Sequence, residues 1–346
     1  MRVTLNDIAK KLQVSKTAVS MALRNNPGIS RSRCQQIQKA AKEMGYVPDP
    51  FLSGLAAHRR GRADAKGHGV LAWVNHWENP ERLRRFKEFN AYWQGASKAA
   101  SELGYRLDDI RWDLDCSPKR FERILLARGI QGVLIPPHNE LLDWKDFDWS
   151  RFSVIRFGMS VQNPDSNQVT SDVFRATMMG IKKIHEYGYT RISIAVNEEF
   201  NQRLGGNFLS AYYYAQNLLK LKPALPPLLT VLKFRDAVRM AKQKVPLQQW
   251  LVRHKPDAIL AADIELPDMI RGLGYRIPQD IALAGTSLLD IPVDAGIDQC
   301  SEAIGRIAVE MLVKQINVSE RGEPSDPCRI LIESRWQDGS SLPPKR

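Results

Sequence analysis

The first fifty positions place apolar residues at the spacing of three short amphipathic helices. The predicted inner faces contain Leu5, Ile8, Ala9 and Leu12 in the first helix, Val19, Ala22 and Leu23 in the second, and Ile37, Ala40, Ala41 and Met44 in the third. Two short breaks, Gln13-Val14 and Asn26-Pro27-Gly28, separate these stretches. Three short helices with a tight turn between the first two predict a helix-turn-helix unit.

Residues that commonly cap helices precede each stretch. Thr4 stands three positions before Asp7, which is the capping-box pattern, and Ser15 and Ser30 precede the second and third helices. Gly45 follows the third stretch, where a glycine often ends a helix. A small helical bundle with no role in DNA binding would show the same periodicity, so both interpretations stay open on this pattern.

From Gly69 onward, short apolar runs alternate with amphipathic stretches. The predicted strands are Val70–Asn75, Arg106–Trp112, Gly132–Pro136, Ser153–Phe157, Arg191–Val196, Leu228–Phe234, Ala258–Ala261 and Ile281–Ala284. The predicted helices include Phe86–Leu103, Phe121–Ala127, Ala176–Tyr187, Arg203–Leu219 and Leu247–His254. Strands that alternate with helices indicate βαβ units and parallel sheets. We therefore expect an α/β fold of two doubly wound lobes with a cleft between them.

Positive charge is concentrated in the N-terminal fifth of the chain. Residues 1–66 contain 13 Lys and Arg against 4 Asp and Glu, whereas the remaining 280 residues contain 37 against 34. A basic segment on a nearly neutral body is typical of a chain that meets a polyanion, although a merely solvated basic face gives the same count. No apolar run approaches the roughly 18 residues that span a membrane, and the first residues lack a signal-peptide pattern, so we expect a cytoplasmic protein.

The sequence patterns of common enzymes and metal sites are absent. The four cysteines, Cys34, Cys116, Cys300 and Cys328, form no CxxC pair, and the six histidines have no ligand spacing. The sequence contains no GxxxxGK[ST] or GxGxxG loop, no GxSxG elbow and no HExxH. Asp113 and Asp115 are paired carboxylates near a predicted strand end, but a solvated loop is the simpler interpretation. We expect no catalytic activity, no cofactor and no metal.

The N-terminal residues carry a family resemblance. The motifs T-x-x-D-I-A, V-S-x-x-x-V-S, S-x-x-R and G-Y-x-P follow one another in register across some fifty residues. This segment resembles the headpiece of the lactose-repressor (LacI/GalR) family of bacterial transcription regulators. The resemblance implies that the second helix enters the major groove of operator DNA, where its N-terminal residues read bases.

The resemblance also implies roles for individual residues. Bases would be contacted by Lys16, Thr17 and Met21, and phosphates by Thr4, Ser15, Ser20 and Ser30. Arg24 and Arg33 are expected phosphate partners by their charge alone. Gln13 departs from the Gly or Asn that the family usually has in the turn, where those residues tolerate a left-handed backbone. Met21 replaces a polar reader found in several members, so the operator sequence does not carry over.

A short segment with a helix start follows the headpiece. Asp49 suits an N-cap and Pro50 the first helical position, but the segment is short and contains Gly54, so we expect it to order on DNA. In the family this segment is the hinge helix, whose two copies in a homodimer insert leucines into the minor groove. Leu55 aligns with that leucine, and Leu52 flanks it. The alternative is that these apolar side chains cover the body of the protein.

The rest of the chain resembles the family's sensor domain more loosely, for example in Gly188-Tyr189-x-Arg191-Ile192 and Gly274-x-x-Ile277-Pro278. That domain is similar to periplasmic sugar-binding proteins, and it implies a small-molecule effector, a sugar, between the lobes. The candidate effector contacts are Asn75, His76, Trp77, Arg203, Asp263 and Ser287. Where many members carry an acid after Val-Gly-(Tyr/Phe), this chain has Thr286-Ser287-Leu288 after Gly285.

The predicted organisation is therefore a headpiece at residues 1–48, a hinge helix and basic linker at 49–66, and a sensor domain at 67–340. Within the sensor domain we expect lobe 1 at about 67–160 and 291–322, and lobe 2 at about 161–290 and 323–340. The predicted function is that of a cytoplasmic, nucleoid-associated, homodimeric regulator, a repressor, whose affinity for a pseudo-palindromic operator changes with the effector. The alternative is a non-enzymatic sugar sensor whose basic N-terminal module serves a partner other than operator DNA.

Overall fold

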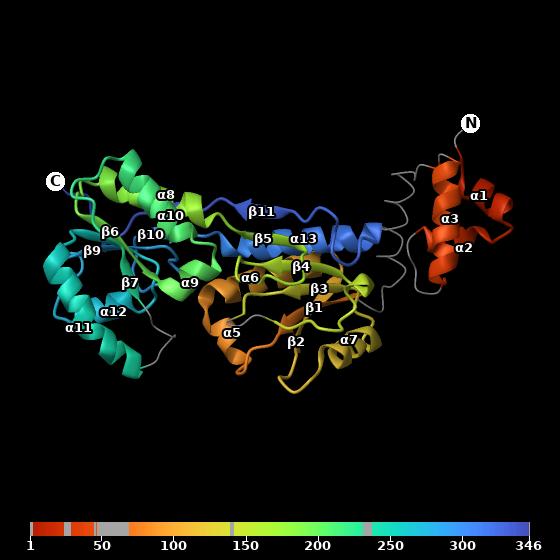
Figure 1. Ribbon diagram of the computed structural model, residues 1–346, viewed down its shortest axis with the longest axis horizontal. Helices are drawn as coiled ribbons and strands as arrows, with labels where there is room; N and C mark the ends of the chain where they lie inside the picture. Colours follow the sequence, from red (N-terminus) through yellow and green to blue (C-terminus); the bar gives the residue numbers. More distant parts are fainter. Residues whose placement is uncertain are drawn as a thin grey trace.

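A computed structural model describes residues 3–23, 29–44, 46, 69–138, 142–230 and 237–345 (Figure 1). Several predicted features lie outside the described residues: the hinge helix and linker at 49–66 with Leu52 and Leu55, the phosphate partner Arg24, and the helix stop at Gly45. No helix in the part of the chain that the structure describes is long and apolar enough to cross a membrane.

The N-terminal unit contains three helices, α1 (Leu5–Leu12), α2 (Lys16–Ala22) and α3 (Arg31–Glu43). One apolar side chain from each helix, Ile8, Val19 and Ile37, is fully buried in a common core. The apolar faces predicted for the three helices thus pack against one another in a small bundle, and the predicted helix-turn-helix unit is confirmed.

Two six-stranded sheets form the rest of the molecule. Lobe 1 is built on a wholly parallel sheet in the order β11 (Arg329–Ile332), β5 (Asn167–Ser171), β4 (Ser153–Phe157), β3 (Gly132–Ile135), β1 (Gly69–Asn75) and β2 (Tyr105–Arg111). Lobe 2 is built on the order β12 (Arg335–Gln337), β10 (Gly296–Asp298), β9 (Ala282–Gly285), β8 (Ala258–Ala261), β6 (Ile192–Asn197) and β7 (Leu228–Thr230). In lobe 2 only the β10–β12 pair is antiparallel among the described strands.

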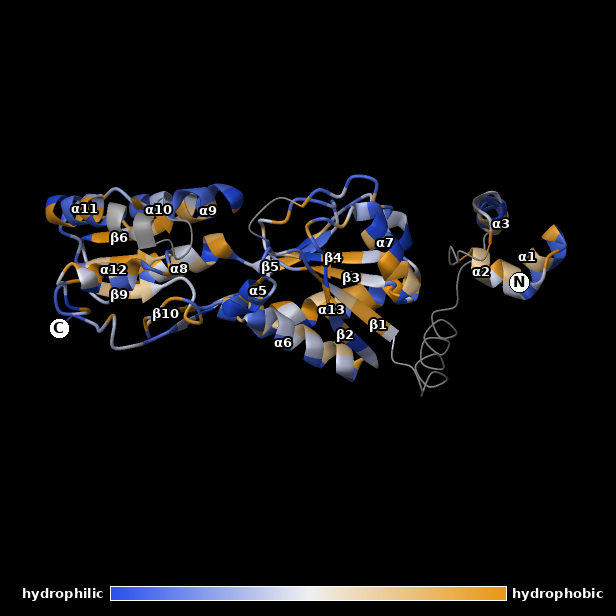
Figure 2. Ribbon diagram, turned by 90° about the horizontal axis from the view of Figure 1, so that it is seen from below, coloured by the Kyte–Doolittle hydropathy of each residue, from blue (hydrophilic) through white to orange (hydrophobic). Residues whose placement is uncertain are grey.

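Helices cover both faces of each sheet, as the doubly wound α/β prediction requires. In lobe 1, α6 (Lys87–Glu102) and α13 (Ser301–Val318) pack on one face, and α7 (Pro118–Ala127) packs on the other. In lobe 2, α8 (Val173–Glu186) and α10 (Asn207–Leu218) cover one face, and α11 (Ala237–His254) and α12 (Leu266–Gly272) cover the other. Figure 2 shows the apolar strands inside each lobe and polar outer surfaces on the helices.

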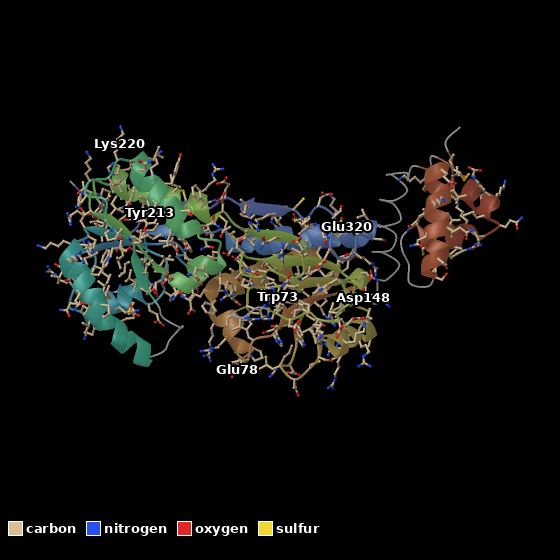
Figure 3. All side chains as sticks on the ribbon, viewed as in Figure 1. Trp73, Glu78, Asp148, Tyr213, Lys220 and Glu320 are labelled. Carbon is tan, nitrogen blue, oxygen red and sulfur yellow. The ribbon has the colours of Figure 1, made fainter. Side chains whose placement is uncertain are left out.

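Alternation along the central strands explains the two cores of each lobe. Leu71 and Trp73 of β1 belong to the core under α6 and α13, whereas Ala72 and Val74 belong to the core under α7. Because successive side chains of a strand point to opposite faces, a strand buried on both faces reads as a continuous apolar run. Trp73 is fully buried near the centre of lobe 1 (Figure 3).

The chain crosses between the lobes at places that correct the predicted boundaries. The strand β5 pairs with β4 in lobe 1, so the first crossing follows residue 171 rather than 160. The strand β10 pairs with β9 in lobe 2, so the second crossing follows residue 298 rather than 290. The third crossing lies between β11 and β12, at residues 333–334 rather than 323.

The missed strands have a physical reason in common. The β5 strand is buried throughout although four of its five residues are polar, and β10, β11 and β12 contain only three or four residues each. The strands β5, β10 and β12 therefore give no apolar run that could be detected in the sequence, and the run in β11 is limited to residues 330–332.

Several predicted elements have different bounds; the helix expected at Leu247–His254, for example, begins at Ala237 as α11. The helix expected at Arg203–Leu219 is observed as α10, which begins at Asn207, and Arg203 instead ends the separate helix α9 (Glu198–Arg203). Gly205 and Gly206, with φ values of 68° and 75°, lie between the two helices. The strand predicted at Leu228–Phe234 is described as a strand only over Leu228–Thr230, and its remaining residues lie outside the described part. The short helices α5 (Glu81–Arg85) and η1 (Trp149–Arg151) were not predicted.

Candidate functional site

The tight turn before α2 sets the direction of that helix. Gln13 has a left-handed backbone, with φ 51° and ψ 45°, at the position where the sequence pattern favours Gly or Asn. A left-handed backbone costs a residue other than glycine roughly 1 kcal/mol. The N–H of Val14 donates to the carbonyl of Ala9 at 3.1 Å, which closes the turn. The chain therefore adopts the expected turn despite the glutamine.

The first turn of α2 is capped and presents polar side chains. The hydroxyl of Ser15 accepts a hydrogen bond from the N–H of Ala18 at 3.0 Å. Lys16 and Thr17 are exposed, and Met21 is half-buried one turn further along the helix. Because Val19 and Ala22 fill the core on the opposite side, the outer face of α2 offers a cation, a hydroxyl and a thioether to an incoming partner.

Most of the expected phosphate contacts that the structure describes lie at or near helix N-termini, and Ser20 lies in the second half of α2. The backbone N–H and the hydroxyl of Thr4 both donate to the carboxylate of Asp7, at 2.8 and 2.7 Å, and these bonds hold the pKa of Asp7 below its usual value. Ser30 is the N-cap residue of α3, but its hydroxyl makes no cap bond and lies 3.4 Å from that of Ser32. Arg33 donates from Nη1 to Oε1 of Gln36 at 2.6 Å. Ser20 is half-buried on α2.

The ends of the central strands of the two lobes face each other. Arg203 ends α9 in lobe 2, and its guanidinium donates to the backbone carbonyl of His138, which follows β3 in lobe 1. Nearby, Nδ2 of Asn207 in lobe 2 lies 3.4 Å from the sulfur of Met159 in lobe 1. In a doubly wound fold, ligands bind outside the carboxyl ends of the strands, so this contact region is the candidate effector site.

Hydrogen bonds fix the protonation state of His138. Its Nε2 accepts from the backbone N–H of His76 at 3.0 Å, so Nδ1 carries the proton and donates to the carbonyl of Pro136 at 2.7 Å. Burial lowers the pKa of His138 to about 3, with smaller contributions from His76 and Arg203. His138 is therefore a neutral side chain that holds the ends of β1 and β3 together.

The residues predicted at the end of β1 have their polar atoms satisfied within lobe 1. Nδ2 of Asn75 donates to the carbonyl of Pro80 at 3.1 Å, and Nε1 of Trp77 donates to that of Pro137 at 3.1 Å. His76 lies with Nδ1 2.7 Å from the carbonyl of Trp112. Asn75 and Trp77 are buried, and His76 is half-buried. The structure thus brings His76, Trp77 and Arg203 together around His138.

Asp263 and Ser287 take part in other contacts. Asp263 follows β8 and accepts from the hydroxyl of Thr230 and, at 2.9 Å, from the N–H of Glu265. The hydroxyl of Ser287, after β9, donates to Oε1 of Glu88 on α6 at 2.5 Å. A cavity of about 480 Å³ beside residues 288–294 is also lined by Lys87 and Arg271, but it contains none of the six predicted effector residues.

Sequence reasoning missed two residues of this region, His138 and Glu88. His138 follows a predicted strand just as His76 and Trp77 do, so the rule of strand ends could have found it. Glu88 is an acid four positions before Tyr92 on a face of α6 that is otherwise apolar, and an acid on a buried helical face is a detectable signal. Among the described residues, no group of three His, Cys, Asp or Glu side chains could hold a metal ion.

The low pKa of His138 predicts a pH effect on stability. The unfolded chain takes up this proton near the ordinary pKa of 6.5, whereas the folded chain resists it down to about 3. Stability should therefore fall as the pH drops from about 6.5 toward 4, by up to about 1.4 kcal/mol per pH unit from this group. Thermal unfolding measured across this range should show a shallower decline for His138→Gln. Parallel curves for the two proteins would contradict the assignment.

Comparisons with known proteins agree with this architecture. Residues 4–49 match the family described as bacterial regulatory proteins, lacI family, and residues 181–342 match the periplasmic binding protein-like domain. The HTH-type transcriptional repressor CytR of Escherichia coli (strain K12) is 43% identical over 353 residues, which cover 95% of each chain.

Solved structures share the fold across nearly the whole chain. A complex of the transcriptional regulator CelR with cellobiose is 19% identical, with a TM-score of 0.59, and the match covers 98% of this chain and all of that one. The lac repressor dimer bound to operator and the anti-inducer ONPF is 15% identical, with a TM-score of 0.55, and the match covers 99% of this chain and all of that one. With the identity to CytR over 95% of its length, the chain belongs to the LacI family of DNA-binding transcriptional regulators.

Proposed function

We propose that this protein is a cytoplasmic homodimeric repressor that reads a pseudo-palindromic operator with two copies of α2, and that a sugar between the lobes changes its operator affinity. The DNA-reading role is supported by the arrangement of buried, capping and exposed residues on α2. Its inner face fills the headpiece core, its N-terminus is capped by Ser15, and its outer face exposes Lys16 and Thr17. This is the arrangement in which a recognition helix presents its first turn to base edges.

Each reader has a matching chemistry in the major groove. The ammonium of Lys16 donates to O6 and N7 of guanine, and the methyl groups of Thr17 and Met21 suit the methyl group of thymine. Hydroxyls at Thr4, Ser15, Ser20 and Ser30 and the guanidinium groups of Arg24 and Arg33 suit phosphates, which fix the register of the protein on the duplex. The role of Leu55 and Leu52 as a minor-groove wedge rests on the sequence resemblance alone.

The effector role rests on the contact region between the lobes. Arg203 donates from lobe 2 to lobe 1, and His76 and Trp77 lie beside its partner His138. An arginine fork and an indole ring suit the hydroxyls and the ring face of a sugar. The cellobiose complex of CelR has the same two-lobed fold. A ligand that binds one lobe arrangement more tightly shifts the population toward it, and this changes the spacing of the two headpieces.

Selection of binding sites from a random duplex pool tests this proposal. The full-length protein is incubated with the pool at about 150 mM salt, with and without a panel of sugars, and the retained duplexes are sequenced. Enrichment of two short half-sites in inverted order supports a dimeric operator reader, and a sugar that changes the enrichment supports the effector role. A pool without any motif in all conditions would favour the alternative of a sugar sensor whose basic module serves another partner.

Replacing Lys16 by alanine should relax the selected motif at one position of each half-site. A bidentate contact from a side chain to a base is worth roughly 1–3 kcal/mol of discrimination, so the preferred base there should lose most of its enrichment. Lys11→Ala removes an equally exposed charge from α1 and should leave the motif unchanged. An unaltered motif in the Lys16 variant would mean that this side chain contacts phosphate instead.

A further inference from the structure

A carboxylate is buried at the junction between the two lobes. Glu88 lies in the first turn of α6 in lobe 1 and is 5% exposed. One of its oxygens, Oε1, accepts from the hydroxyl of Ser287 in lobe 2 at 2.5 Å, and the other accepts from the hydroxyl of Ser301 at the start of α13 in lobe 1. The same carboxylate is therefore bonded once across the lobe boundary and once within its own lobe.

Apart from the hydroxyls of Ser287 and Ser301, the surroundings of Glu88 disfavour a negative charge on its carboxyl group. No salt bridge within the described residues includes Glu88, and Asp290 and Asp298 add negative charge near it. Burial, the largest effect, raises its pKa, and the two serine hydroxyls act in the opposite direction. Burial of an acid without a nearby cation costs free energy unless hydrogen bonds compensate for the lost water. The two hydroxyl bonds are thus what makes the arrangement tolerable.

A second bond ties the same loop of lobe 2 to the same turn of α6. The backbone N–H of Lys87 donates to Oδ1 of Asp290 at 2.7 Å. The N–H of Asp290 in turn donates to the hydroxyl oxygen of Ser287 at 3.2 Å, so Ser287 is oriented while its proton points to Glu88. The contact between lobes is therefore built from a short, internally braced loop rather than from one flexible side chain.

This junction is distinct from the contact between Arg203 and His138. On the lobe 1 side the two are separated by Trp77, whose ring centroid lies 6.4 Å from that of His138 and 5.8 Å from that of Phe86. Phe86 immediately precedes the turn of α6 that contains Glu88. The lobes are thus in contact at two places with aromatic side chains between them. Loss of one contact should therefore weaken the other.

We propose that Glu88 and Ser287 form an interlobe latch that holds the two lobes in their present arrangement and must release when the lobes separate. The proposal deepens the proposed function, because it names the interaction that would break as the lobe arrangement changes. Ser287 stands where many members of the family carry an acid, and in this chain the acid is supplied by the opposite lobe. The hydrogen bond from Ser287 of lobe 2 to the carboxylate of lobe 1 breaks when the lobes separate. An acid located in lobe 2 alone would not form such a bond between lobes.

Ser301 provides a matched control for the latch. Both serines donate to the same carboxylate, but Ser301 belongs to α13, which packs on α6 within lobe 1. Ser287→Ala removes the bond that crosses between lobes, and Ser301→Ala removes an equivalent bond that does not. Any general effect of removing one hydrogen bond to Glu88 should appear in both variants. Release of the latch should appear only in Ser287→Ala.

Hydrogen–deuterium exchange of the full-length protein without ligand tests the latch. The readout is the exchange of residues 198–206 and 76–81, which include or adjoin residues of the Arg203–His138 contact and contain neither the substituted serines nor Glu88. Removal of one hydrogen bond to the buried carboxyl group of Glu88 should raise the population with separated lobes, and hence exchange in both segments, roughly tenfold in Ser287→Ala and in Glu88→Ala. Ser301→Ala should match the unmodified protein in both segments.

Two results would overturn the latch: unchanged exchange at the remote segments in Ser287→Ala, or an equal rise in Ser301→Ala. If Glu88→Ala fails to fold, the comparison of the two serine variants decides the question alone. Operator affinity, measured on a selected duplex, separates this inference from the proposed function. Faster remote exchange in Ser287→Ala with unchanged operator affinity would support the latch and count against coupling between lobe arrangement and DNA binding.

Discussion

Replacing Gly305 by alanine is expected to destabilise lobe 1 strongly. Gly305 on α13 faces α6 so closely that an added Cβ would lie 2.0 Å from the carbonyl oxygen of Tyr92 and 2.8 Å from the backbone nitrogen of Ala96. Gly95 on α6 makes the reciprocal approach, with a Cβ 1.9 Å from the carbonyl oxygen of Glu302. The two helices thus touch backbone to backbone, and no rotamer change can relieve the overlap.

The expected cost is at or above the upper end of the range for overpacking, about 3 kcal/mol, because the helices must move apart as units. At roughly 2–4 °C per kcal/mol, the apparent Tm of lobe 1 should fall by about 6–12 °C. The fluorescence of Trp73, buried in the core under these helices, contributes to the signal that follows this unfolding.

Gly272→Ala is the matched control for this substitution. Gly272 ends α12, its backbone is not left-handed, and an added Cβ meets no atom within 4 Å. Alanine there should leave the Tm unchanged or raise it slightly, because alanine favours a helix by up to about 1 kcal/mol over glycine. A drop in stability as large as that of Gly305→Ala would mean that the loss does not come from the close packing of α6 on α13, because the unfolded-chain effect of replacing glycine by alanine is stabilising.

The sequence pattern predicted those parts of the fold in which local chemistry and burial coincide. The central strands β1 and β8 were predicted within a residue because they are buried on both faces and read as apolar runs. The strand β5 was missed because its polar side chains find partners far away in the sequence. Oδ1 of Asn167, for example, accepts from the N–H of Cys328 at 2.7 Å, and Ser171 donates to Gln299 at 3.1 Å.

The same distinction applies to the candidate site. The caps and inner faces of the headpiece helices involve residues three or four positions apart, so Ser15 and Val19 could be placed from the sequence. The contact of Arg203 with His138 joins residues 65 positions apart, and that of Ser287 with Glu88 joins residues 199 positions apart. Such pairs follow from the folding of two lobes against each other, which no local pattern encodes.

Operator affinity should fall by roughly 10³–10⁵ when salt rises from 50 to 200 mM, if the dimer neutralises about 6–10 phosphates. The excess positive charge of residues 1–66, with 13 basic against 4 acidic residues, makes such a number of phosphate contacts reasonable for two headpieces. Titrations of a selected duplex at several salt concentrations give the slope of log affinity against log salt. A slope near zero would remove the polyanion-binding role of the basic segment.

Single substitutions should show which side chains neutralise phosphates, because only the loss of a phosphate contact lowers the salt slope equally for every duplex. Arg33→Ala removes a proposed phosphate partner and should lower the slope by about 1 for each phosphate that is no longer neutralised, equally for any duplex sequence. Lys16→Ala removes the same charge from the first turn of α2, yet should keep more of the slope while weakening the preference for one base. If both variants lower the slope alike and leave the selected motif intact, Lys16 contacts phosphate, and base reading must come from Thr17 and Met21, the two remaining readers on the outer face of α2.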